Sequence, residues 1–130
     1  TLLRSGGLGP CVALGAIYGQ YGSMVHVIDP RADSEFSEIL TDLSRKNVSR
    51  LQIYVAGACP YFDNHKPSHV RLRREKAKQT RNYVLKSLDE HGLTPALREV
   101  RWGNYDECLE LLLFLHEQRG EIQSELLDSK

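Results

Sequence analysis

The chain has 130 residues and a mass of 14.8 kDa, which suits one domain with a core of its own. Hydrophobic residues make up 41% and charged residues 26%, a composition that excludes disordered and collagen-like chains. The 17 basic and 17 acidic side chains cancel, so the protein as a whole is not built to bind polyanions. We therefore expect a single domain over residues 1–130.

The cysteine count and the hydropathy indicate where the protein works. Cys11, Cys59 and Cys108 are too few and too scattered for a disulfide framework, and no Cys-x-x-Cys spacing is present. An odd count of this kind predicts either a reducing compartment or a free thiol with a function. The expected compartment is the cytoplasm of the protein's own cell, or the host cytosol if the protein is a secreted effector. No apolar run approaches the ~20 residues that a membrane span requires, so we expect no membrane partner.

The first third of the chain predicts a β-hairpin that follows a glycine-rich turn. Residues 5–10 (SGGLGP) form the turn, and residues 11–18 and 23–28 read as strands around a second turn at 19–22. A loop with an even number of residues places Cys11 and His26 on one face of the hairpin. A two-residue loop would make them diagonal neighbours, ~7–8 Å apart between backbones, and a four-residue loop would separate them further.

The remainder predicts alternating helices and strands. Helices are expected over 34–46, capped by Asp33 or Ser34, and over 70–91, ended by Gly92; strands are expected over 50–56 and 95–101. The inward faces of the two helices would use Phe36, Ile39, Leu40 and Leu43, and Val70, Ala77, Val84 and Leu88.

The end of the chain is ambiguous from periodicity alone. Residues 108–115 suit either a helix or a strand, and the strand alternative has a turn at 117–120 and a return over 121–126. Because at least one adjacent strand pair is antiparallel, the pattern predicts an α/β (α+β) fold, in which a mixed, largely antiparallel sheet packs with two long helices.

Cys11 and His26 are the residue types that thiol chemistry needs. A thiolate is the nucleophile, and an imidazole can take and return a proton near neutral pH. The turn before the cysteine can aim the N–H groups of Gly7, Gly9 and Cys11 at a developing oxyanion, whereas Pro10 has no N–H to offer. On spacing alone, however, such a cysteine is more often a small buried residue, and such a histidine more often belongs to the core.

Two segments carry a resemblance to a known family. Residues 8–13 (LGPCVA) and 22–30 (GSMVHVIDP) resemble the CheD chemoreceptor glutamine deamidases, which have LGSCVA and a Gly-Gly-Met-Ala-His segment at these places. Weaker similarity in the same order covers 50–62, 81–88 and 93–104, and so nearly the whole chain. The Cys–His core is also similar to that of cytotoxic necrotising factor toxins and of N-terminal asparagine amidohydrolases.

The resemblance implies roles for three residues. Cys11 falls on the family's nucleophile, His26 on its general base and acid, and Ser5 on a catalytic threonine that orients the imidazole. The chain departs from the family at Pro10, where a serine is usual, in a slightly shorter hairpin, and in lacking an arginine after Asn104. These departures bear on the substrate rather than on the chemistry. The family's C-terminal hairpin also favours strands over 108–126.

The implied function is that of a cysteine-dependent protein glutamine deamidase, a hydrolase that converts Gln to Glu and releases ammonia. It would need no metal and no organic cofactor, and its partner would be a protein that carries a reactive glutamine. One alternative is a bacterial effector or toxin that deamidates a host protein, on asparagine or glutamine. The alternative from another class is a non-catalytic module that docks an acidic partner.

A cluster of basic residues offers a surface for such docking. Residues 66–81 hold seven basic side chains and one acidic side chain. At helical spacing one stripe collects Arg71, Arg74, Lys78 and Arg81, which could dock an acidic protein surface or simply form a solvated helix face. Aromatic residues are not interleaved with the basic ones, so nucleic-acid binding is not expected.

The loop between the expected strand over 50–56 and the expected helix over 70–91 contains residues of the types that bind metals. These are Cys59, Asp63, His65 and His69. Their spacing is loose, and Pro67 disrupts a helical arrangement of the two histidines. We expect a polar loop near the active site rather than a metal centre.

Overall fold

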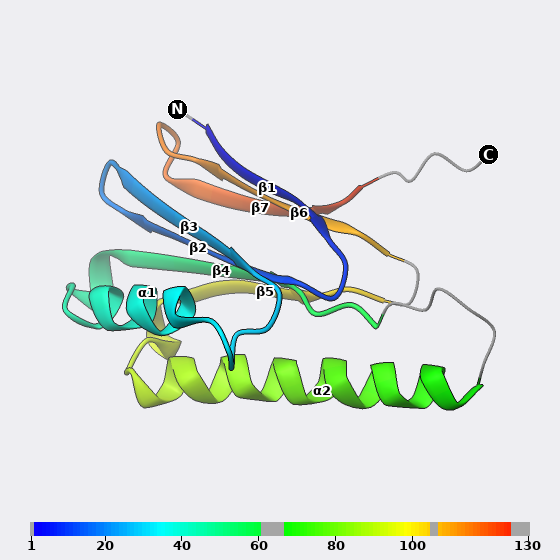
Figure 1. Ribbon diagram of the computed structural model, residues 1–130. Coiled ribbons are helices and arrows are strands. Elements are labelled where there is room, and N and C mark those ends of the chain that lie inside the picture. The colour runs from blue at the N-terminus through cyan, green and yellow to red at the C-terminus, as the bar shows by residue number, and fades with distance from the viewer. Residues whose placement is uncertain (1, 61–66, 105–106, 126–130) are drawn as a thin grey trace.

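The computed structural model of the protein contains two sheets and two α-helices (Figure 1). It describes residues 2–60, 67–104 and 107–125, of which 67–71 through the backbone alone. The strands are β1 (Leu2–Leu8), β2 (Val12–Tyr18), β3 (Tyr21–Val27), β4 (Leu51–Gly57), β5 (Leu97–Trp102), β6 (Leu109–Phe114) and β7 (Arg119–Ser124). The helices are α1 (Ser34–Ser44) and α2 (Pro67–Glu90), with short 3-10 helices η1 (Val48–Arg50) and η2 (Thr94–Ala96).

The two sheets differ in size and are stacked. One sheet has the order β3-β2-β4-β5, with a parallel β4–β5 pair and antiparallel pairs elsewhere, and the other is β1-β6-β7, wholly antiparallel. The four-stranded sheet lies between the three-stranded sheet and the helices (Figure 1). The predicted α+β class is confirmed. The strands form two sheets where the sequence predicted one, because β1, β6 and β7 pair with one another and not with the other four strands.

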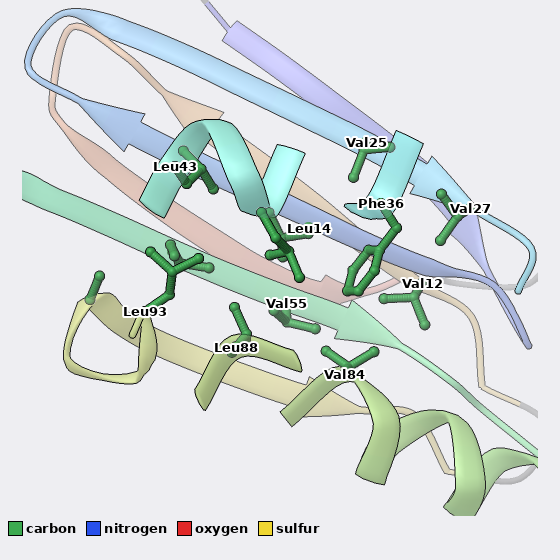
Figure 2. Packing of buried hydrophobic residues seen from close by; sticks show 14 of the residues in the cluster. Val12, Leu14, Val25, Val27, Phe36, Leu43, Val55, Val84, Leu88 and Leu93 are labelled. Atoms are coloured by element: carbon green, nitrogen blue, oxygen red, sulfur yellow. The ribbon is translucent and has the colours of Figure 1, made fainter. Parts of the chain in front are cut away.

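Strand alternation gives the four-stranded sheet two buried faces. On β2, Val12, Leu14 and Ala16 pack toward the helices, whereas Ala13 and Ile17 pack toward the other sheet. Figure 2 shows the helix-side core. The helices contribute to the core the buried side chains Phe36, Leu40, Leu43, Ala77, Val84 and Leu88. These predicted inward faces are confirmed, except that Ile39 is only half-buried against the core and Val70 lies outside the described side chains.

Gly15 lets the two sheets approach each other. A Cβ atom at this position would lie 3.0–3.2 Å from side-chain atoms of Leu111 and Leu113 on β6. Such contacts are tighter than most Cβ atoms make, so a larger residue would require the two leucine side chains to shift. The small residue in the middle of β2 therefore belongs to the stacking of the sheets.

The N-terminal region differs from the predicted turn over 5–10. Residues through Leu8 belong to β1, which pairs with β6 and shifts its register between Ser5 and Leu8. Gly7 has φ +65°, which only glycine adopts without strain, and the chain then bends at residues 9–11. The glycines of the local sequence indicated a flexible backbone, but they did not indicate that β1 pairs with β6, about a hundred residues further along the chain.

The other boundaries follow local chemistry. The β2–β3 loop has two residues, since Tyr18 pairs with Tyr21. The side chain of Asp33 caps α1, accepting from the N–H of Glu35 at 2.8 Å, as expected. Helix α2 begins three residues earlier than expected, at Pro67, a residue well suited to the first helical position. In the described ranges, no helix is both long and apolar enough to cross a membrane.

The C-terminal region forms the predicted hairpin rather than a helix. Strands β6 and β7 pair from Leu109↔Ser124 to Phe114↔Arg119, and the turn lies at 115–118, two residues before its expected place. The inward side chains Leu109, Leu111 and Leu113 are fully buried between the sheets. Their alternation with outward-facing neighbours is the period-two pattern of a strand.

Candidate active site

A hydrogen bond joins Ser5 on β1 to His26 on β3. Ser5 Oγ lies 2.8 Å from His26 Nδ1. His26 is paired with Ala13, whose side chain lies between the sheets, so the imidazole is on the face of the hairpin that looks toward the three-stranded sheet. β1 and β3 are each the edge strand of their sheet, and the bond therefore bridges two edges. Ser5 is buried, while His26 is exposed to solvent.

Cys11 lies in the bend just before β2. The first ladder pair is Val12↔Val27, so a continued register would set Cys11 opposite Ile28 and diagonal to His26. Diagonal neighbours lie about 7–8 Å apart between backbones, within reach of side-chain rotation. Among the described residues, no hydrogen bond joins the thiol to His26. The structure thus brings Ser5 and His26 together, and it places Cys11 in the bend directly before β2, the strand that pairs with β3.

The Cys11 thiol is half-buried and protonated in the resting protein. Burial raises its pKa above the usual 9.0, and a hydrogen bond from its own backbone N–H opposes this shift only in part. A thiol with a raised pKa is a poor nucleophile at neutral pH unless a base removes its proton. Any nucleophilic role for Cys11 therefore requires a general base.

The glycines before Cys11 have their N–H groups engaged. Gly7 donates to Glu125 Oε1 at 2.7 Å, and Gly9 donates to the carbonyl oxygen of Gly7 at 3.0 Å. Gly7 belongs to β1 and Gly9 to the bend that follows it, and their N–H groups are not directed at the cysteine. Of the three predicted oxyanion donors, the Cys11 N–H is the one that lies beside the thiol.

A small groove borders the cysteine bend. Its volume is about 120 Å³. One wall holds Pro10, the neighbour of Cys11, and Ile28, which is 76% exposed. The rest of the lining consists of Cys59 and, on α2, Arg73, Lys76, Ala77 and Thr80. The groove therefore lies between the bend that carries Cys11 and helix α2.

The predicted basic stripe is divided by the structure. Arg74 and Lys78 are exposed, and the side chain of Arg71 lies outside the described part of the chain. Arg81 instead turns inward and donates from Nε to the carbonyl oxygen of Ala58 at 3.1 Å and from Nη2 to that of Gly103 at 2.7 Å. It is therefore not available for docking in the way that we predicted.

Sequence reasoning missed the cations that face the groove, Arg73 and Lys76. It also missed the inward role of Arg81, although a signal was present. Arg81 follows Ala77 by four residues and precedes Val84 by three, which is the spacing of the buried face of the helix.

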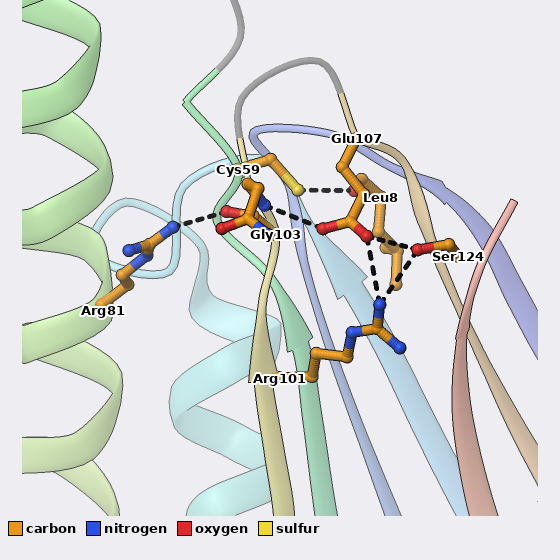
Figure 3. A network of polar contacts seen from close by, with 8 residues as sticks. Leu8, Cys59, Arg81, Arg101, Gly103, Glu107 and Ser124 are labelled. Atoms are coloured by element: carbon orange, nitrogen blue, oxygen red, sulfur yellow. Dashed lines mark hydrogen bonds and ion pairs between the residues drawn. The ribbon is translucent and has the colours of Figure 1, made fainter.

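A second polar cluster ties the end of β5 to β7 (Figure 3). The Glu107 carboxylate accepts from Arg101 Nη2 at 3.1 Å, from the N–H of Asn104 at 2.8 Å and from Ser124 Oγ. These bonds lower the pKa of Glu107, the bond from Ser124 most of all. No sequence motif connects β5, the segment with Asn104 and Glu107, and β7, so this cluster was not predicted.

Cys59 serves the packing of the loop after β4. Its thiol donates to the carbonyl oxygen of Leu8 at 3.2 Å, and burial raises its pKa to about 11. Asp63 and His65 lie outside the described residues, and His69 is placed through the backbone of α2 alone. Within the described ranges, no three His, Cys, Asp or Glu side chains gather in a way that could hold a metal ion.

No known protein-family model matches the chain, and a search of curated proteins also gave no match. The fold and the site together define an α+β protein of two stacked sheets. Ser5 and His26 form a hydrogen-bonded pair between the edge strands β1 and β3, and the free cysteine Cys11 lies in the bend before β2.

Proposed function

We propose that the protein is a cysteine-dependent deamidase that converts a glutamine side chain of a protein substrate to glutamate. The observation that carries the proposal is the 2.8 Å contact between Ser5 Oγ and His26 Nδ1. It occupies one ring nitrogen and leaves Nε2 for proton transfer, on the face of the hairpin that the register assigns to Cys11. The resemblance of residues 8–13 and 22–30 to the CheD deamidases supports the same roles.

The first half of the reaction forms a thioester. When His26 Nδ1–H donates to Ser5 Oγ, Nε2 carries the lone pair that accepts the Cys11 proton. The thiolate attacks the carboxamide carbon, and the Cys11 N–H is placed to stabilise the oxyanion. The imidazolium returns the proton to the leaving nitrogen, which departs as ammonia.

The second half releases the acid. His26 takes a proton from water, the hydroxide attacks the thioester carbon, and the carbon–sulfur bond breaks. The thiolate regains its proton from the imidazolium. The net reaction consumes one water and exchanges an amide for a carboxylic acid, so no metal, oxidant or reductant enters the balance.

The raised pKa of Cys11 determines the order of events. The resting thiol is protonated, and its proton moves when the substrate amide arrives rather than beforehand. The groove between Pro10, Ile28 and α2 offers the approach for the substrate. The Cys11 thiol and the His26 imidazole then move closer together as the substrate binds.

Mass spectrometry of candidate target proteins tests the proposal. Incubation with the wild-type protein should convert a specific glutamine to glutamate and release ammonia, and Cys11→Ala should abolish both. Cys108→Ala is the matched control, since it removes a thiol outside the site and should keep the activity. If Cys11→Ala keeps the full biological effect, the protein acts as a binding module and the proposal is wrong.

A further inference from the structure

The bend that carries Cys11 is held by the loop after β4. Two backbone bonds join them, from the N–H of Ala58 to the carbonyl oxygen of Cys11 at 2.9 Å and from the N–H of Cys59 to that of Gly9 at 2.8 Å. The Cys59 thiol adds a bond to the carbonyl oxygen of Leu8. The position of the candidate nucleophile therefore depends on residues 58 and 59.

Those two residues need support of their own. Ala58 has φ +48°, a left-handed conformation that is unfavourable for a residue with a side chain. It follows Gly57, which has φ +122° and at which a Cβ atom would lie 2.1 Å from the carbonyl oxygen of Cys11. A loop with this backbone persists only when surrounding groups fix it.

Arg81 supplies that support from α2. Its guanidinium donates to the carbonyl oxygens of Ala58 and Gly103, and so joins the ends of β4 and β5. Figure 3 shows the bond to Gly103. The same group lies 5.8 Å from the centre of the Trp102 ring. A planar fork with several N–H donors can serve two carbonyls and an aromatic face at once, whereas a lysine ammonium on its flexible stem cannot reproduce that geometry.

We propose that Arg81 is a positioning residue of the deamidase site, which fixes the Cys11 bend by clamping Ala58 and Gly103. The inference rests on the proposed function for its catalytic meaning. Arg81 touches neither the thiol nor His26, and it acts through Ala58, whose N–H holds the carbonyl oxygen of Cys11. Loss of the clamp should let the bend open, hydrate the thiol and move it relative to the imidazole.

The test compares Arg81→Lys with Lys86→Gln, which removes an exposed cation from the same helix. Amide hydrogen exchange by NMR should be about tenfold or more faster at Ala58 and Cys59 in Arg81→Lys, and unchanged at Leu14 in the centre of β2. The pH midpoint of Cys11 alkylation by iodoacetamide, followed by peptide mapping, should fall by about half a unit or more as the thiol becomes hydrated. Lys86→Gln should change neither quantity.

The inference is overturned if a folded Arg81→Lys protein keeps both the exchange rates and the alkylation midpoint of the wild type. If Arg81→Lys is unfolded at room temperature, the same measurements on Arg81→Gln decide. Unfolding of both variants would also overturn it, since Arg81 would then support the whole domain rather than the bend. Neither readout requires a substrate, so failure of Cys11→Ala to abolish deamidation would refute the proposed function without affecting this test.

Discussion

Ser5 and His26 lie on different sheets, and their side chains meet at 2.8 Å. The serine is buried on β1 and the histidine is exposed on β3, so the bond fixes an otherwise solvent-facing ring from its inner side. An imidazole held at one nitrogen presents the other in a defined direction. This relationship underlies the following expectations for the chemistry of the site.

Removal of the Ser5 hydroxyl should impair the reaction more than the fold. We expect Ser5→Ala to lower kcat of deamidation by about 10- to 100-fold, because His26 loses its orienting partner. The loss of one hydrogen bond should cost about 1 kcal/mol of unfolding free energy. Ser5→Thr keeps a hydroxyl on a strand-favouring residue and should retain most of the activity. Equal rates for the alanine and threonine variants would contradict the role of the hydroxyl.

The Cys11 thiol should react slowly with iodoacetamide at neutral pH. Burial raises its pKa above 9.0, so the thiolate fraction and the alkylation rate should keep rising through pH 9 and beyond. Peptide mapping separates Cys11 from the other two cysteines. If the alkylation rate of Cys11 has already reached its plateau near neutral pH, the thiol is a preformed thiolate. That result would contradict a protonated resting thiol.

Gly57 should tolerate no side chain. Gly57→Ala places a Cβ atom 2.1 Å from the carbonyl oxygen of Cys11 on a backbone with φ +122°, and we expect a loss of about 3 kcal/mol or more in unfolding free energy. Gly92→Ala is the matched control, because it also has positive φ but has open space around its Cβ position; its cost should be about 1–2 kcal/mol. Urea unfolding measures both, and equal costs would exclude the predicted collision.

Cys59 should make the fold sensitive to alkali. Its pKa of about 11 lies above the ordinary value of 9.0, so the thiol keeps its proton to a higher pH in the folded state than in the unfolded chain. The contribution to stability is complete below pH 9 and is lost as the pH rises through 11. A shift of this size corresponds to roughly 2–3 kcal/mol.

Comparison with Cys59→Ala isolates this effect from the titration of tyrosines and lysines. The alanine variant should be less stable than the wild type at about pH 8, and the gap between them should narrow by roughly 2 kcal/mol at about pH 10.5. Urea unfolding at the two pH values provides the measurement. A gap that stays constant would show that the thiol does not titrate with folding.

The sequence predicted the local parts of the site. Turn residues and period-two alternation identified the β2–β3 hairpin, and its two-residue loop was one of the two lengths considered. Helical periodicity identified the buried faces of α1 and α2. In each case the interacting residues are close in the chain, so local geometry constrains them.

The sequence failed where contacts are distant in the chain. The pairing of Ser5 with Leu111 places β1 in the second sheet, and nothing near either residue indicates the other. We assigned Arg81 to a basic stripe because of its charge, although its spacing places it on the buried face of α2. Its side chain points inward, where it donates to the carbonyl oxygens of Ala58 and Gly103 in two separate loops. The assignment of Ser5 to a triad came from the resemblance to a family rather than from a local pattern.

By itself, the sequence determined the fold class, the inward faces of the helices and the β2–β3 hairpin that carries His26, because strand and helix periods fix which side chains share a face. Only the tertiary structure decided that the strands divide into two sheets, that Ser5 reaches His26, and that the cysteine bend is clamped from α2. These depend on pairing between segments that are far apart in the chain, and such pairing is selected by the packing of the whole core rather than by any local pattern.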